Sequence, residues 1–229
     1  MHKIDIPQFL VQRMQSRLGR LHIFETIVPA RTAHLVVDLQ NAFMAPGQPV
    51  EVPLAREIVP NVNRISAAVR AAGGIVVFLQ NTMDAATHDS WSNYLENFLS
   101  PERQERFNAA FRPGSFGHSL WPALDVTAAD LKVPKYRYSP FVSGSSDLHA
   151  LLGKRGIDTL IISGTSTNVC CESTARDASM MNYKVIFVAD GSATYTDAEH
   201  NATLGNLLLF VDVVTTDEVV ALLGRHTPR

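Results

Sequence analysis

Cysteine is scarce in this sequence: the 229 residues contain two, Cys170 and Cys171, and they are adjacent. Neighbouring Cα atoms lie about 3.8 Å apart, whereas disulfides prefer roughly 4.4–6.8 Å, so a bridge between the two is disfavoured. A disulfide framework and a zinc site with paired cysteine ligands are therefore excluded. Two free thiols indicate a reducing compartment, and we expect the cytoplasm.

An excess of charge of either sign is also lacking, because 20 Lys and Arg face 22 Asp and Glu, for a net charge of -2. We expect no nucleic-acid partner, since no basic surplus is available for a phosphate backbone. No apolar run approaches the ~18 residues of a membrane span, so no membrane partner is expected. With 46% hydrophobic and 18% charged residues, the composition is typical of a soluble globular chain.

What is present is an alternation of strand-like and helix-like segments. Short β-branched apolar runs predict buried strands at His34–Asp38, Ile75–Leu79, Thr159–Ser163, Val185–Ala189 and Phe210–Val214. Helical patterns lie between them at Val59–Ala72, Asp147–Lys154, Val169–Asn182 and Asp197–Leu209. This order predicts an α/β fold, a three-layer αβα sandwich around a mostly parallel sheet. Functional residues are then expected at the carboxyl ends of the strands.

The domain organisation follows from two irregular regions. Residues 1–30 form an N-terminal arm with a short basic amphipathic segment, which is either a targeting helix or an arm that packs on the body or on a second subunit. Residues 31–229 form a single domain. Within it, about residues 81–130 interrupt the alternation with aromatic residues such as Trp91 and Phe116. An insertion of that length predicts a lid or pocket wall, roofed by those rings.

Three residues stand where such a fold places its chemistry. Asp38 ends the first predicted strand among apolar neighbours, and it is either functional or a cap of the next segment. Lys135 follows a short strand-like piece and a proline, where a solvated loop residue is the alternative. Cys170 opens a helix directly after another strand. The positive helix start predicts a lowered pKa for this thiol, with Cys171 as a small core residue; alternatively both thiols are inert core residues.

Other signals are weaker. Ser166 occupies a strand-to-helix turn, and a serine hydrolase with His200 or His226 is an alternative, although the G-x-S-x-G pattern needs glycine where Asn168 stands. The run Asp84 to Asp89, with His88, matches no metal-ligand spacing, so no metal site is predicted. No glycine-rich nucleotide loop is present.

Taken together, three ordered segments resemble the isochorismatase-like cysteine hydrolases. They are apolar-Asp-x-Gln-Asn around Asp38, Pro-Lys-x-Arg-Tyr-Ser-x-Phe around Lys135, and Gly-x-x-Thr-Asn-Val-Cys-x-Glu-Ser-Thr around Cys170. The resemblance runs from about Thr32 to Leu223 and is greatest to ureidoacrylate amidohydrolases and N-carbamoylsarcosine amidases. It implies a Rossmann-like topology. Gln80-Asn81-Thr82 stands where nicotinamidases carry metal ligands, which argues against a metal and against nicotinamide as substrate.

The resemblance also implies a catalytic triad of Asp38, Lys135 and Cys170, and a cis peptide bond between Thr165 and Ser166. The N–H groups of Ser166 and Cys170 would then form an oxyanion hole. In the implied reaction, Cys170 attacks an amide or ureido carbonyl, a thioester forms, and ammonia is released without a cofactor.

The substrate expected from this chemistry is a small amide or ureido acid. Candidate binding residues are Asn81, Arg137, Tyr138 and Trp91, with Arg137 either anchoring a carboxylate or making a surface ion pair. A homodimer or homotetramer is expected. Besides the serine hydrolase, the remaining alternative is a non-catalytic interaction module whose thiol has an ordinary pKa.

Overall fold

The computed structural model describes residues 1–225, apart from the side chains of Ala85 and His88. In that part of the chain, six strands form one sheet in the order β3-β2-β1-β4-β5-β6, and neighbouring strands pair in parallel. The strands are β1 (Thr32–Val37), β2 (Ile75–Asn81), β3 (Leu131–Lys135), β4 (Thr159–Thr165), β5 (Lys184–Ala193) and β6 (Asp212–Val214). The prediction of an α/β fold with a mostly parallel sheet is confirmed.

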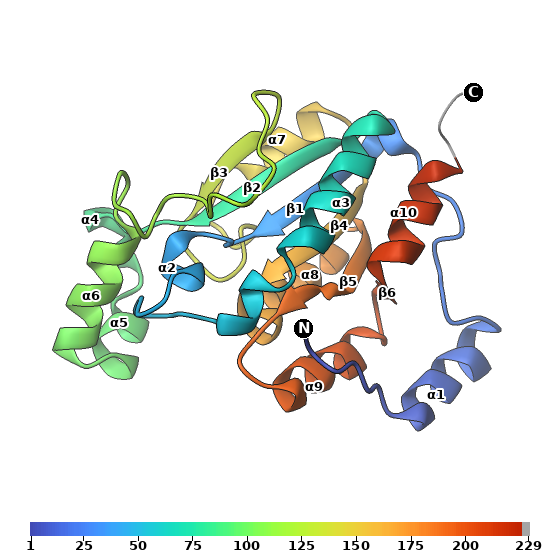
Figure 1. The fold of residues 1–229 in the computed structure, drawn as a ribbon, viewed down its shortest axis with the longest axis horizontal. Coiled ribbons are helices and arrows are strands. Elements are labelled where there is room, and N and C mark those ends of the chain that lie inside the picture. Colours follow the sequence, from blue (N-terminus) through green and yellow to red (C-terminus); the bar gives the residue numbers. More distant parts are fainter. Residues whose placement is uncertain (226–229) are drawn as a thin grey trace.

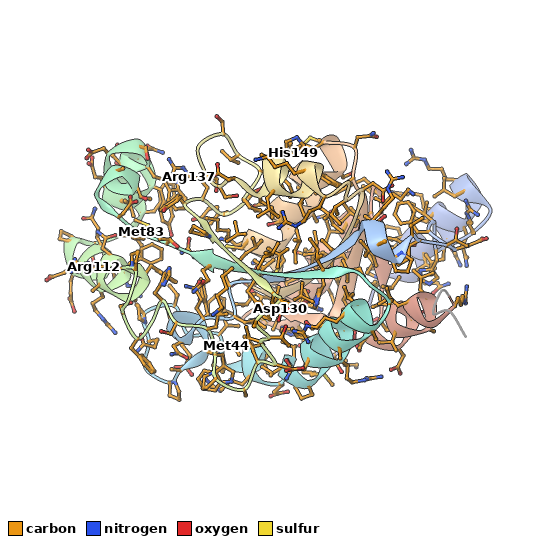
Figure 2. All side chains as sticks on the ribbon, turned by 90° about the horizontal axis from the view of Figure 1, so that it is seen from above. Met44, Met83, Arg112, Asp130, Arg137 and His149 are labelled. Carbon is orange, nitrogen blue, oxygen red and sulfur yellow. The ribbon has the colours of Figure 1, made fainter. Side chains whose placement is uncertain are left out.

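Helices cover both faces of the sheet, as Figures 1 and 2 show from two directions. One face packs against α3 (Val59–Ala71) and α10 (Thr216–Gly224). The opposite face packs against α1 (Gln8–Leu18), α7 (Leu148–Lys154), α8 (Glu172–Met180) and α9 (Asp197–Leu207). Strands buried on both faces explain the continuous apolar runs in the sequence. None of the described helices is long and apolar enough to cross a membrane.

The segment predicted as a pocket wall forms a helical cap at the carboxyl end of the sheet, at the left of Figure 1. Its helices are α4 (Ala85–Ser90), α5 (Ser92–Phe98) and α6 (Pro101–Phe111), and the short α2 (Asn41–Met44) follows β1 beside them. Leu95, Phe107 and Phe111 join the same apolar cluster as α3, so this cap is anchored by core packing.

Phe116, an aromatic residue of this segment, is more exposed than the sequence predicts. Predicted to roof the pocket, it is 63% exposed. The backbone holds this turn in place, because the Asn41 side-chain amide donates to the Phe116 carbonyl at 2.9 Å and the Ala42 N–H donates to the Gly117 carbonyl at 2.9 Å. Since these contacts use only main-chain groups of the turn, the Phe116 ring is left outside the core.

Candidate active site

Three strand ends carry the residues singled out in the sequence. Asp38 directly follows β1, Lys135 is the last residue of β3, and Cys170 comes shortly after β4. The carboxyl ends of parallel strands meet at one edge of a sheet, so residues about 130 positions apart in the chain come together there. The α4–α6 cap lies over the same edge (Figure 1).

The Lys135 ammonium joins the other two side chains. Its Nζ lies 2.8 Å from Asp38 Oδ2 and 3.4 Å from Cys170 Sγ. The Asp38 carboxylate also contacts the thiol, and its Oδ1 accepts the Asn81 N–H at 3.0 Å. Asp38 and Lys135 are fully buried and Cys170 is 5% exposed. Buried charges are tolerated only when they are paired, and this cluster pairs them.

The backbone around Asp38 is shaped by a close approach of β1 and β4. A Cβ at Gly164 would lie 2.1 Å from the Val37 carbonyl oxygen, so only glycine fits at this position of β4. Directly after Val37, Asp38 has a φ of 53°, in the left-handed region that short polar residues such as Asp adopt most readily after glycine. The chain turns there, with the Gln40 N–H donating to the Asp38 carbonyl at 2.8 Å.

The cysteine stands in a wider turn than the helix predicted from Val169. Thr167–Cys171 form a single π-helical turn, and α8 begins only at Glu172. The Cys171 N–H donates to the carbonyl of Ser166, five residues earlier, at 3.1 Å, and this longer spacing widens the turn. The peptide bond between Thr165 and Ser166 is cis, as the family resemblance implied. The role of the Ser166 and Cys170 N–H groups as an oxyanion hole stays a prediction.

Burial reverses the pKa shift expected for the thiol. Desolvation raises the pKa of Cys170, and the adjacent Asp38 raises it further, against the favourable charge of Lys135. A helix start favours a lowered thiol pKa, but the sequence does not show how completely the sulfur is removed from water, and desolvation outweighs the helix start here. In the resting site Cys170 is therefore a neutral thiol.

Burial acts in opposite directions on the pKa values of Asp38 and Lys135. Burial raises the pKa of Asp38, with Lys135 opposing the rise. Burial disfavours the ammonium of Lys135, but the Asp38 carboxylate 2.8 Å away outweighs this and raises the pKa of Lys135. Lys135 therefore stays protonated, and Asp38 is a stronger base than an exposed carboxylate, which suits it to accept a proton from the thiol.

Three aromatic rings form a cluster beside Cys170. Tyr138 lies near Cys170, and burial raises its pKa, with Tyr94 and Cys170 adding to the rise. The Tyr138 ring meets Trp91 edge-on at 5.0 Å and Tyr94 at 5.6 Å, while Trp91 and Tyr94 stack at 4.6 Å. The structure thus brings together Trp91 and Tyr138, two of the predicted substrate-binding residues, beside a third aromatic residue that the sequence analysis did not single out.

Arg137 joins the Lys135 segment to the α4–α6 cap, beside which it lies in Figure 2. Its guanidinium donates to the carbonyls of Tyr136 (2.6 Å) and Ser90 (2.8 Å) and lies 5.2 Å from the Trp91 ring centre. Its own carbonyl accepts the Lys135 ammonium at 3.1 Å. The guanidinium is thus bound to backbone groups at the rim of the site, and its role as a carboxylate anchor stays a prediction.

Gln40 is a site residue that the sequence analysis did not identify. Its fully buried side chain accepts the Asn81 N–H at 2.7 Å and donates to the Asn81 and His118 carbonyls. It thereby fixes Asn81, the predicted substrate-binding residue whose N–H also holds Asp38. The signal available was its place in the segment Asp38-Leu-Gln-Asn, two residues after the carboxylate.

The alternative of a serine hydrolase needs a histidine base beside Ser166, and the described residues do not supply one. His200 Nδ1 lies 2.9 Å from the Thr167 hydroxyl, and no histidine is hydrogen-bonded to Ser166 within residues 1–225. His226, the other base considered, lies outside the described residues. Among the described side chains there is also no group of three or more His, Cys, Asp or Glu that could hold a metal ion. Asp84 instead accepts from Thr87, while the His88 side chain lies outside the described part.

Comparison of the sequence with known proteins finds one domain family and many relatives. The isochorismatase domain matches residues 32–218. Ureidoacrylate amidohydrolase RutB from Pseudomonas savastanoi pv. phaseolicola is 34% identical over 197 residues, which cover 80% of this chain and 79% of that protein. RutB from Variovorax paradoxus is 35% identical over 201 residues, covering 81% and 78% of the two chains.

Solved structures show the same architecture. A cysteine hydrolase from Pseudomonas syringae pv. phaseolicola superposes with a TM-score of 0.77 at 28% identity, covering 90% of this chain and 98% of that one. N-carbamoylsarcosine amidase from Thermoplasma acidophilum, at 24% identity, shares the fold with a TM-score of 0.65, covering 82% and 97%.

Proposed function

Because the chain belongs to the isochorismatase family and is a hydrolase of carbon–nitrogen bonds in linear amides, we propose that it cleaves a small amide or ureido acid through a covalent intermediate on Cys170. One observation carries the proposal: the Lys135 ammonium contacts both the Asp38 carboxylate and the Cys170 sulfur in a buried site. A thiol, a base of raised pKa and a fixed cation are the groups that nucleophilic acyl transfer requires.

The reaction proceeds in two halves. Asp38 accepts the thiol proton as Cys170 Sγ attacks the carbonyl carbon, and Lys135 stabilises the negative charge on the sulfur. The N–H groups of Ser166 and Cys170 hold the oxyanion. Asp38 then protonates the departing nitrogen, leaving a thioester, or a thiocarbamate from a ureido group. Water that loses a proton to Asp38 hydrolyses this intermediate and restores the thiol. These steps use only groups of the chain and water.

The positive charge of a cleft beside the aromatic cluster supports a substrate that carries a carboxylate. A cavity of about 710 Å³ lies between the α5–α6 helices and residues 48–51, and Tyr94 of the aromatic cluster forms part of its wall together with Arg103, Arg106 and Tyr195. The one carboxylate lining it, Glu51, is paired with Arg56 at 2.9 Å. Within the described residues neither Arg103 nor Arg106 has an ion-pair partner, so the cleft is positive and attracts anions.

Ammonia release across a panel of small primary amides and ureido acids tests the proposal. We expect turnover of at least one ureido or amide acid, and a mass increase on Cys170 when the reaction is quenched early. Prior alkylation with iodoacetamide should abolish turnover, whereas a fluorophosphonate should leave it intact. Sensitivity to the fluorophosphonate alone would favour the serine alternative, and absence of any turnover would favour the interaction module. A cytoplasmic homodimer or homotetramer remains part of the proposal.

A further inference from the structure

The N-terminal arm lies outside the matched family segment, and its first residues are bound to α9. Asn201 holds this strap from both sides, donating to the Lys3 carbonyl at 2.8 Å and accepting the Asp5 N–H at 2.7 Å. The Lys3 N–H donates to Asp197 at 3.3 Å. Residues 2–5, here called the strap, therefore have a defined path across the surface of the molecule.

His2 is the part of the strap that reaches inward. Its side chain is 2% exposed, and its ring stacks on the ring of His200 at 4.3 Å. The Thr194 backbone N–H, which can only donate, points to His2 Nε2 at 3.0 Å. His2 Nε2 is therefore unprotonated, and Nδ1 carries the hydrogen donated to Asp197 at 2.8 Å. All the polar atoms of this ring are used, so its position is well determined.

Two short relays connect His2 to the turn that carries the nucleophile. In the first, the His2 ring stacks on the His200 ring, and His200 Nδ1 lies 2.9 Å from the Thr167 hydroxyl. In the second, His2 accepts the Thr194 N–H, and the Thr194 hydroxyl donates to the Asn168 side-chain oxygen at 2.6 Å. Thr167, Thr194 and His200 are fully buried.

Thr167 and Asn168 stand between Ser166 and Cys170, the residues whose N–H groups would bind the oxyanion. We propose that His2 is a positioning residue: through both relays, the strap holds the Thr167–Cys171 turn in the geometry that oxyanion stabilisation requires. This inference rests on the proposed function. Small displacements of such donors are costly, since a misplacement of about 1 Å can reduce a rate by roughly 10²-fold.

The test compares His2→Ala with His2→Gln and with Lys3→Ala, a matched strap variant that removes an exposed side chain. For the substrate found in the panel, His2→Ala should lower kcat about 5- to 50-fold with little change in KM, less than the roughly 10²–10³-fold loss of a whole oxyanion donor. The Gln side chain can still accept the Thr194 N–H, so His2→Gln should recover part of the loss. Lys3→Ala should match the unmodified chain.

Alkylation of Cys170 by iodoacetamide supplies the readout that separates positioning from general damage, because alkylation needs the thiolate but no oxyanion hole. Its rate in His2→Ala should stay within about 2-fold of the unmodified chain, with Cys171 distinguished by peptide mass. An unchanged kcat, or an equal fall in kcat and alkylation, would overturn the inference.

Hydrogen exchange keeps this test separate from the proposed function. If no substrate is turned over, the proposed function fails, but the backbone amides of residues 167–171 should still exchange faster in His2→Ala than in Lys3→Ala. Equal exchange in the two variants would show that the strap does not hold the turn.

Discussion

At the scale of single residues, the two adjacent cysteines belong to one apolar cluster but differ in their contacts. Cys170 faces the Lys135 ammonium at 3.4 Å, whereas Cys171 is fully buried in the apolar cluster beneath α8. Successive positions of a helical turn point in different directions, so one thiol reaches the charged cluster while its neighbour packs in the core.

Cys170→Ala should abolish turnover, a loss on the order of 10⁴-fold or more, because no other thiol reaches the Lys135 ammonium. Cys171→Ala should retain turnover and lower the free energy of unfolding by about 1–2 kcal/mol, since it removes only a buried sulfur. Steady-state kinetics and urea unfolding measure the two effects. Retained activity in Cys170→Ala would refute the covalent mechanism.

Asp38 and Lys135 form one buried ion pair, so their contributions to the rate should be coupled. Asp38→Asn and Lys135→Ala should each reduce kcat/KM by about 10³-fold or more, and the double variant should lose far less than the product of the two losses. A double-variant cycle of kcat/KM measures the coupling. Strictly multiplicative losses would show that the two side chains act independently.

At the scale of elements, two sets of arginines are candidates to bind the carboxylate of the proposed acidic substrate. Arg103 and Arg106 are one turn apart on α6 and line the cleft, while Arg137 binds the backbone of α4. An arginine already donating to carbonyls is less available to an anion than one without a partner.

The double variant Arg103→Gln/Arg106→Gln should lower kcat/KM for an acid about 10-fold at low salt and leave its neutral amide analogue unchanged. The difference between the acid and its neutral analogue should shrink at about 0.5 M salt, because salt screens the attraction between the arginines and the carboxylate. Arg137→Ala is the comparison variant: if it alone raises KM for the acid more than for the neutral analogue, the carboxylate lies at the rim. Equal effects on both substrates in every variant would remove all three arginines from substrate recognition.

At the scale of the whole molecule, stability depends on a histidine buried in the middle of the sheet. His34 of β1 is fully buried between Ser66 of α3 (3.0 Å) and Ser163 of β4 (2.7 Å). Burial, with a smaller contribution from Arg70, lowers its pKa from 6.5 to about 3. The folded chain therefore keeps His34 neutral over a pH range in which the unfolded chain protonates it.

Stability should consequently fall as pH falls below 6.5, at up to about 1.4 kcal/mol per pH unit until the folded pKa near 3 is reached. Between pH 7 and pH 5 the loss from His34 alone should be about 2 kcal/mol. Urea unfolding of His34→Gln should show a shallower pH dependence. His149→Gln, which replaces an exposed histidine on α7 (Figure 2), serves as control and should keep the original slope. Identical slopes in all three proteins would contradict the assignment.

Sequence alone determined the alternation of strands and helices, because apolar periodicity and β-branched runs are local properties. It also placed Asp38, Lys135 and Cys170 at strand ends, which a parallel sheet brings to one edge. The resemblance to a known family added the cis bond at Thr165–Ser166, which local patterns do not reveal.

Only the tertiary structure decided the environment of these residues. The raised pKa of Cys170, the exposure of Phe116, the backbone contacts of Arg137 and the link from His2 to Thr167 all depend on segments distant in sequence. Desolvation and hydrogen bonding are set by every atom around a group, whichever part of the chain supplies it. Local sequence patterns contain no record of those neighbours.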